Sequence, residues 1–181
     1  MHSSQLRRPP VTDRAPGEGA VVVLIGAPGA GKTRTGKRIA RLLDVPFIDT
    51  DRRIVADHGP IAALFESHGE PHFRAIERDV VAAALDETAV VTLGGGAVLD
   101  PDTQSRLEGY RVVQLTVSPE AVEARISGGK RPLIKDGIGA WISLVEGRRP
   151  IYDRLSQLTV DTSHRPLDGV AQQIVDWLGT K

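Results

Sequence analysis

The chain lacks several features that would point to whole classes of protein. It has no cysteine among its 181 residues, which excludes disulfide bonds and thiolate metal sites and favours a cytoplasmic location. Lysine plus arginine and aspartate plus glutamate are equal at 23 each, so no overall field attracts nucleic acid. No apolar run reaches the roughly 20 residues of a membrane-spanning helix, and no apolar segment follows Arg7 and Arg8 as in a secretory signal. We therefore expect neither a nucleic-acid nor a membrane partner.

The length and composition suit one globular domain. Hydrophobic residues make up 40% of the chain, which is enough for a sizeable core. Residues 1–18 are rich in proline, serine and charge without periodicity, so we predict a disordered N-terminal tail. Residues 19–181 are predicted to form a single domain. No dimer seam is apparent in the sequence, and we expect a monomer.

The most informative segment is an apolar run that leads directly into a glycine-rich loop. Residues 21–25 are all aliphatic, as in a strand that is buried on both faces. Residues 26–33, GAPGAGKT, match the phosphate loop G-x-x-x-x-G-K-[ST] at the place after a strand where that loop occurs. Its glycines let N–H groups turn toward an anion, Lys32 supplies a cation, and the Thr33 hydroxyl is a ligand for Mg²⁺. We therefore predict a nucleotide site, with a helix beginning near residue 32, rather than a glycine-rich turn without a ligand.

Strands and helices alternate along the rest of the chain. Apolar runs predict further strands at 45–49, 89–93, 111–117 and 157–160, with helical patterns between them and a closing helix at 170–178. This alternation predicts a three-layer α/β/α fold with a five-stranded parallel sheet. Ligands of such folds bind at the carboxyl edge of the sheet, so Asp49 and Asp51, where the second strand ends, are candidate site residues.

A basic segment flanked by glycines interrupts this pattern. Residues 128–139 read GGKRPLIKDGIG, and we predict that about 127–139 form a mobile lid over an anionic ligand. The plain alternative is a solvated, variable loop.

Several motifs in a fixed order make the prediction more specific. After the phosphate loop come DTD at 49–51, GEPHFRAIE at 69–77, GGGAV at 94–98, RPL at 131–133 and RRPIY at 148–152. This combination resembles the shikimate kinase family over residues 20–178. The resemblance implies a P-loop kinase fold with a mobile lid. It also implies transfer of the ATP γ-phosphoryl group to the 3-hydroxyl of shikimate, a step toward chorismate and the aromatic amino acids.

The resemblance implies a set of residues for the acceptor. Arg74 and Arg148 match arginines that bind the shikimate carboxylate, which a planar guanidinium can hold through two parallel hydrogen bonds. Glu77, one turn after Arg74, would fix that guanidinium in place. Asp51 matches the carboxylate that contacts ring hydroxyls and could accept the proton of the attacking hydroxyl. The remaining acceptor residues are the glycine triplet Gly94, Gly95 and Gly96.

The resemblance also implies a nucleotide side. Arg131 matches the lid arginine that reaches the phosphates and spreads the charge of the transfer step. Arg125 resembles an arginine on the adenine side, although it lies one residue closer to Arg131 than the family spacing. Magnesium is the implied cofactor of ATP, at Thr33 and, through water, at Asp49. The implied nucleotide-binding residues are Gly29, Ala30, Gly31, Lys32, Thr33, Arg34, Arg125, Arg131 and Arg165.

Several of these assignments have alternatives. An Arg–Glu pair three residues apart is often a surface salt bridge, and Asp49 could simply cap a helix. A slip of one residue would select Arg149 instead of Arg148 for the carboxylate. Trp141 and Trp177 lie in helical patterns and are predicted to be packing residues.

Two other functions compete with the leading one. A gluconate-type sugar-acid kinase would also need a carboxylate grip and a lid, but the FRAIE and RRPIY motifs weigh against it. A nucleotide-binding scaffold without catalysis is opposed by the intact Lys32, Thr33, Asp49, Asp51 and Arg131.

Overall fold

The structure, a computed structural model, describes residues 19–127 and 137–179. The predicted tail at residues 1–18 and the centre of the predicted lid, with Arg131, lie outside the described residues. The strands are β1 (Val22–Gly26), β2 (Phe47–Asp49), β3 (Val90–Thr92), β4 (Val112–Thr116) and β5 (Leu158–Asp161). The helices are α1 (Lys32–Leu43), α2 (Thr50–His58), α3 (Ile61–Leu85), α4 (Pro101–Leu107), α5 (Pro119–Ser127), α6 (Gly137–Leu155) and α7 (Leu167–Leu178), with a 3-10 turn, η1, at Ala97–Leu99.

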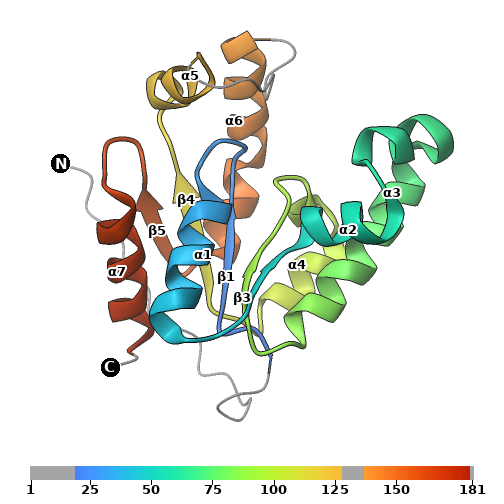
Figure 1. Ribbon diagram of the computed structural model, residues 1–181. Coiled ribbons are helices and arrows are strands. Elements are labelled where there is room, and N and C mark those ends of the chain that lie inside the picture. The colour runs from blue at the N-terminus through green and yellow to red at the C-terminus, as the bar shows by residue number, and fades with distance from the viewer. Residues whose placement is uncertain (1–18, 128–136, 180–181) are drawn as a thin grey trace.

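The five strands form one parallel sheet in the order β2-β3-β1-β4-β5. The strand β1 is central and buried along its whole length (Figure 1). The chain passes from β1 to β2 and β3 on one side and then crosses to β4 on the other. The loop after β1 therefore opens at the switch in direction, where open α/β sheets bind ligands.

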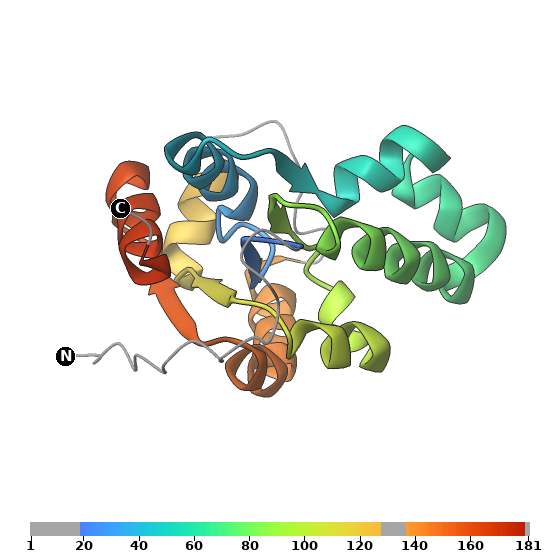
Figure 2. The same cartoon turned by 90° about the horizontal axis from the view of Figure 1, so that it is seen from below.

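Helices cover both faces of the sheet (Figure 2). Successive residues of β1 point to opposite faces, since the side chains of a strand alternate. On one face, Val22 packs with Ile39 under α1 and α7. On the other face, Val23 packs with Val81 of α3 and Tyr152 of α6. Both cores pack against the strands, so the carboxyl ends of the strands are held in fixed positions.

A smaller cluster joins α2 to the first half of α3. Ile54 of α2 packs with Leu64 and Phe73 of α3. The helix α3 is kinked at Gly69, whose φ and ψ are 78° and 171°, just before Pro71, a residue that cannot continue a helical hydrogen-bond ladder. Figure 1 shows α2 and the start of α3 projecting beyond the β2 side of the sheet.

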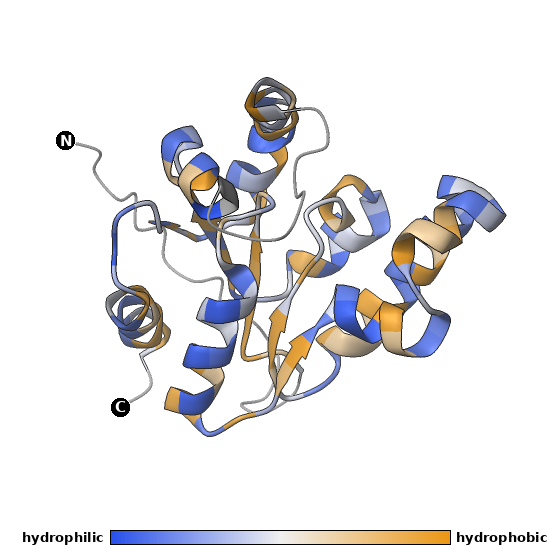
Figure 3. Cartoon of the chain, turned by 45° about the horizontal axis from the view of Figure 1, so that its top comes forward, coloured by the Kyte–Doolittle hydropathy of each residue, from blue (hydrophilic) through white to orange (hydrophobic). Residues whose placement is uncertain are grey.

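The predicted three-layer fold with its five-stranded parallel sheet is confirmed, with strand bounds shifted by one or two residues. Figure 3 shows hydrophobic colour along most of the strands, the pattern from which burial on both faces was expected. The two ends of the predicted lid lie in helices, since Ser127 ends α5 and residues 137–139 begin α6. Within the described ranges, no helix is both long and apolar enough to span a membrane.

Candidate active site

The loop between β1 and α1 has the backbone of an anion site. Gly29 and Gly31 have φ angles of 83° and 88°, which residues with a side chain rarely adopt. The helix α1 begins at Lys32, and no side chain caps its first N–H groups. Since uncapped N–H groups at a helix start attract negative charge, this loop is suited to bind phosphate, as the sequence predicted.

The Lys32 ammonium lies folded against this loop. Its Nζ donates hydrogen bonds to the carbonyl oxygens of Gly26 at 2.7 Å and Ala27 at 3.1 Å. Burial lowers the pKa of Lys32 to about 8, an effect that the Asp51 and Asp49 carboxylates oppose. The two carbonyls are neutral and offer the ammonium only partial negative charges. A bound phosphate would offer a full negative charge, so Lys32 favours an anionic ligand.

Asp49, at the end of β2, uses its two oxygens for different partners. Its Oδ2 accepts a hydrogen bond from the Thr33 hydroxyl at 2.7 Å, and its Oδ1 accepts the Arg52 N–H at 3.2 Å. The second bond caps α2, so the alternative role considered for Asp49 is also present.

The pairing of Thr33 with Asp49 suits a magnesium ion. A hydroxyl and a carboxylate side by side offer the oxygen ligands that Mg²⁺ prefers. In the described part of the chain, no cluster of three or more histidine, aspartate and glutamate side chains could hold a metal. Phosphate oxygens and water would therefore have to complete the coordination, as is usual for Mg²⁺ in nucleotide sites.

Thr50 links the two strand ends on which the site is built. Its buried hydroxyl donates to the Thr92 carbonyl at 3.2 Å and accepts the Gly94 N–H at 3.3 Å. These bonds tie the start of α2 to the end of β3. They fix the position of Asp51, the next residue, relative to the glycine triplet 94–96.

Asp51 faces Gly94 so closely that no side chain fits between them. A Cβ atom added to Gly94 would overlap the Asp51 carboxylate. Burial raises the pKa of Asp51, helped by the nearby Asp49 charge and opposed by Lys32 and Arg74. A carboxylate whose pKa is raised is a stronger base than an ordinary aspartate, which suits proton transfer.

Arg74 is held by two carboxylates beside Gly96. Its Nη1 donates to Glu77 Oε2 at 2.5 Å, and its Nη2 donates to Glu70 Oε1 at 3.2 Å. Glu77 is only 3% exposed, so the pair is not a surface salt bridge. A Cβ on Gly96 would come within 2.7 Å of Arg74 Nη1, which places the guanidinium against the triplet.

Arg148 of α6 reaches the same triplet from another side. Its Nη1 would lie 3.4 Å from a Cβ on Gly95. Arg149 is exposed and lines a different cavity of about 90 Å³ together with Gln114 and Thr116. Of the two arginines that the sequence left open, Arg148 therefore lies with the other acceptor candidates.

The phosphate loop and the glycine triplet lie side by side because β1 and β3 are neighbours. Pro28 Cδ and the Gly26 carbonyl oxygen would be 3.4 and 3.6 Å from a Cβ on Gly95. The arrangement thus places two arginines and one carboxylate, those of Arg74, Arg148 and Asp51, next to the anion site.

Comparison with known proteins agrees with this arrangement. A family model described as shikimate kinase matches residues 28–179. A shikimate kinase from Salinispora tropica is 46% identical over 158 residues, which cover 85% of this chain and 95% of that protein. The chain belongs to the shikimate kinase family. It is accordingly a kinase, a transferase with a nucleotide-binding phosphate loop, as the sequence predicted.

Solved structures give the same result. Shikimate kinase from Acinetobacter baumannii, solved in complex with shikimate, superposes with a TM-score of 0.80 at 27% identity, covering 90% of this chain and 94% of that one. A gluconokinase from Sinorhizobium meliloti has a TM-score of 0.63 at 20% identity, covers 90% and 93%, and shares the fold alone.

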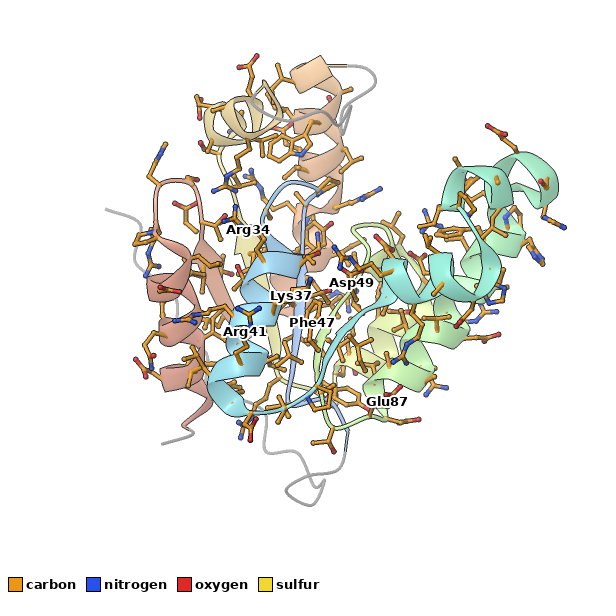
Figure 4. All side chains as sticks on the ribbon, in the orientation of Figure 1. Arg34, Lys37, Arg41, Phe47, Asp49 and Glu87 are labelled. Carbon is orange, nitrogen blue, oxygen red and sulfur yellow. The ribbon has the colours of Figure 1, made fainter. Side chains whose placement is uncertain are left out.

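The remaining described nucleotide candidates of this shikimate kinase family member are Arg125, Arg165 and Arg34, and they differ in their relation to the loop. Arg125 Nη1 donates to the Gly29 carbonyl at 2.9 Å, and its other nitrogen donates to the Thr162 carbonyl. Arg165 donates to Gln173 at 2.6 Å on the exposed side of α7. Arg34 lies on the exposed face of α1 (Figure 4). Within the part of the chain that the structure describes, Arg125 is the one of these three whose side chain hydrogen-bonds to the loop itself.

Three residues of the site were not identified from the sequence as functional. Thr50 gave no signal beyond a hydroxyl between two carboxylates. Tyr152 served only to set the register of the RRPIY motif, yet its hydroxyl donates to the Gly95 carbonyl at 2.8 Å. Trp141 was assigned to packing, yet its Nε1 donates to the Pro28 carbonyl at 2.9 Å.

Proposed function

We propose that this chain transfers the γ-phosphoryl group of ATP to the 3-hydroxyl of shikimate, giving 3-phosphoshikimate and ADP. One observation carries the proposal: Asp51, Arg74 and Arg148 each lie against one residue of the triplet 94–96, beside the phosphate loop. Family membership supports the same reaction. The similar structure of the Acinetobacter baumannii shikimate kinase, solved in complex with shikimate, supports it as well. The reaction is a step in the route to chorismate and the aromatic amino acids.

In this proposal the acceptor is held by its carboxylate. Arg74 and Arg148 donate parallel hydrogen bonds to the carboxylate, and Glu77 and Glu70 keep Arg74 from turning away. The triplet Gly94, Gly95 and Gly96 leaves room for the ring because it lacks side chains.

Asp51 takes the proton as the new bond forms. The 3-hydroxyl oxygen attacks the γ-phosphorus, the bond to the oxygen bridging the β- and γ-phosphorus atoms breaks, and ADP leaves with that electron pair. The hydroxyl proton passes to the Asp51 carboxylate, whose raised pKa favours its acceptance. The protein's further contribution is alignment and positive charge.

The nucleotide side is proposed as follows. The N–H groups of Gly29, Ala30 and Gly31 bind phosphate oxygens, Lys32 moves from its loop carbonyls to the outer phosphates, and Arg34 lies at the start of α1. Mg²⁺, bound at Thr33 and through water at Asp49, would supply charge neutralisation and orientation of the phosphates. Arg125, Arg131 and Arg165 are proposed nucleotide contacts, with Arg131 on the lid. Of these, Arg125 would use the face of its guanidinium, since its N–H groups hold carbonyls.

The surroundings of the enzyme are also part of the proposal. We propose a monomer that works in the cytoplasm with two small-molecule substrates, without a nucleic-acid or membrane partner. The absence of cysteine and the balanced charge support this view.

The test is ADP release in a coupled assay with Mg·ATP and shikimate, gluconate or no acceptor. We expect release that depends on shikimate, and release with gluconate alone would overturn the acceptor assignment. Lys32→Ala should abolish turnover in a protein that keeps its circular dichroism spectrum. Lys37→Ala, on the exposed face of the same helix (Figure 4), is the matched control and should keep turnover.

A further inference from the structure

The helix α6 carries two aromatic hydrogen-bond donors on one face. Trp141 and Tyr152 are eleven residues apart, which is about three turns of helix. Trp141 Nε1 donates to the carbonyl of Pro28 at 2.9 Å, and Tyr152 Oη donates to the carbonyl of Gly95 at 2.8 Å. The two side chains are 5% and 1% exposed, so water does not compete for either bond.

The two acceptor carbonyls belong to the two loops that must cooperate in the reaction. Pro28 lies in the phosphate loop and Gly95 in the acceptor triplet, and these loops touch each other. Arg148 lies between the two aromatic residues on the same helix, seven residues after Trp141 and four before Tyr152. The helix α6 therefore contacts the nucleotide side and the acceptor side and also carries a substrate arginine.

The Trp141 bond completes a series of donors behind the phosphate loop. The four consecutive carbonyls from Gly26 to Gly29 each accept a hydrogen bond from a side chain, and the donors are Lys32 for the first two, then Trp141 and Arg125. The Thr162 hydroxyl lies 3.0 Å from the next carbonyl, that of Ala30, and also 3.0 Å from the Thr116 carbonyl, and its one proton is shared between them. The bonds from Trp141 and Arg125 restrain the peptide groups of Pro28 and Gly29, and within the loop the Ala30 N–H donates to the Ala27 carbonyl at 3.2 Å. Among the described residues, Trp141 is the donor that α6 contributes to this series.

We propose that Trp141 and Tyr152 are positioning residues through which α6 fixes the nucleotide loop relative to the acceptor loop; this rests on the proposed function. In-line transfer depends on the separation of the reacting groups, and a displacement of about 1 Å can cost a large factor in rate. A purely packing role is the alternative, since both rings also belong to the hydrophobic cores. Phenylalanine separates the two roles because it keeps a ring in the core but removes the donor.

The test compares Trp141→Phe, Tyr152→Phe and the double variant. Each single variant should lower kcat by roughly 3- to 10-fold, as expected for a hydrogen bond worth about 1 kcal/mol. Trp141→Phe should also weaken Mg·ADP binding by calorimetry, whereas Tyr152→Phe should instead raise KM for shikimate. The double variant should fall little further than the worse single one, because cutting either end releases α6 from one of the two loops.

The chain offers matched controls for both substitutions. Trp177→Phe removes a buried Nε1 that has no hydrogen-bond partner within the described residues. Tyr110→Phe removes a phenol from the residue two positions before β4 begins, at the end of that strand away from the phosphate loop. Both controls should keep the wild-type kcat. Wild-type kcat in the two test variants, or effects that multiply in the double variant, would overturn the proposal. If the wild-type enzyme failed to use shikimate, the proposed function would fall, while Mg·ADP affinity would still test Trp141.

Discussion

The hydroxyl of Thr33 and the carboxylate of Asp49 are joined by a 2.7 Å hydrogen bond that connects the end of the phosphate loop to the end of β2. This bond uses Oδ2 only, because Oδ1 accepts the Arg52 N–H that starts α2. One side chain therefore combines the proposed electrostatic role toward a metal with a structural role as a helix cap. The two roles can be separated, since asparagine is also a good N-cap but carries no charge.

Asp49→Asn should raise the Mg²⁺ concentration needed for half-maximal rate by about tenfold, while the melting temperature stays nearly unchanged. Asp49→Ala should show the same magnesium defect and also lose the cap. A lost cap costs about 1 kcal/mol, which is a fall in melting temperature of about 2–4 °C for a chain of this size. Magnesium titrations and thermal melts check both variants. Equal magnesium dependence in Asp49→Asn and wild type would contradict a role near the metal.

Arg74→Ala should raise KM for shikimate by about 10- to 100-fold, because hydrogen bonds to a charged group contribute about 1.5–3 kcal/mol. KM for ATP should change by less than about threefold, since the proposed partner of Arg74 is the acceptor carboxylate. Arg74→Lys, which keeps the charge but not the planar fork, should lie between Arg74→Ala and wild type. The control is Arg78→Ala on the same helix, whose guanidinium lies 3.9 Å from Asp100 and Asp102. Equal effects of Arg74→Ala on both Michaelis constants would remove the assignment.

Gly94→Ala should lower kcat by about 100-fold, because the new methyl group would displace the Asp51 carboxylate, the proposed proton acceptor, from its place against Gly94. Gly147→Ala is the matched control: it lies in α6 with nothing within 4 Å of an added Cβ. Alanine there should leave kcat unchanged and raise stability by about 0.5–1 kcal/mol, since glycine weakens a helix interior. Steady-state kinetics with a thermal melt measure both effects. A Gly94→Ala enzyme with normal kcat would mean that Asp51 does not act where we place it.

Local patterns in the sequence predicted the parts of the molecule that depend on neighbouring residues. Uninterrupted apolar runs between helical patterns predicted the strands, and the glycines before Lys32 predicted the phosphate loop. The Arg74–Glu77 pair was also readable, because residues three apart lie on one side of a helix. Its burial was not readable from the spacing. It depends on how α3 packs against η1 and α4, which only the assembled fold provides.

Contacts between distant segments were not predictable in the same way. Trp141 and Pro28 are 113 positions apart, and helical periodicity shows that a tryptophan faces the core but not what its N–H reaches. The glycines at 137 and 139 predicted a loop, yet they open α6. Gly137 has a φ of 81°, which glycine adopts readily, and the helix that follows packs Trp141 and Ile142 in the core.

The rate of nucleotide capture should fall in alkaline solution because Lys32 loses its charge. Burial lowers the pKa of Lys32 from 10.5 to about 8, so in the free enzyme the ammonium form declines as the pH rises past that value. The ratio kcat/KM for ATP reports the free enzyme and should fall about fivefold between pH 8 and pH 9. Bound phosphate favours the charged form, so the alkaline fall in kcat at saturating ATP should lie at higher pH. Lys32→Arg should be slower but should lose the alkaline limb, since a guanidinium keeps its charge over this range. An identical alkaline limb in Lys32→Arg would assign the titration to another group.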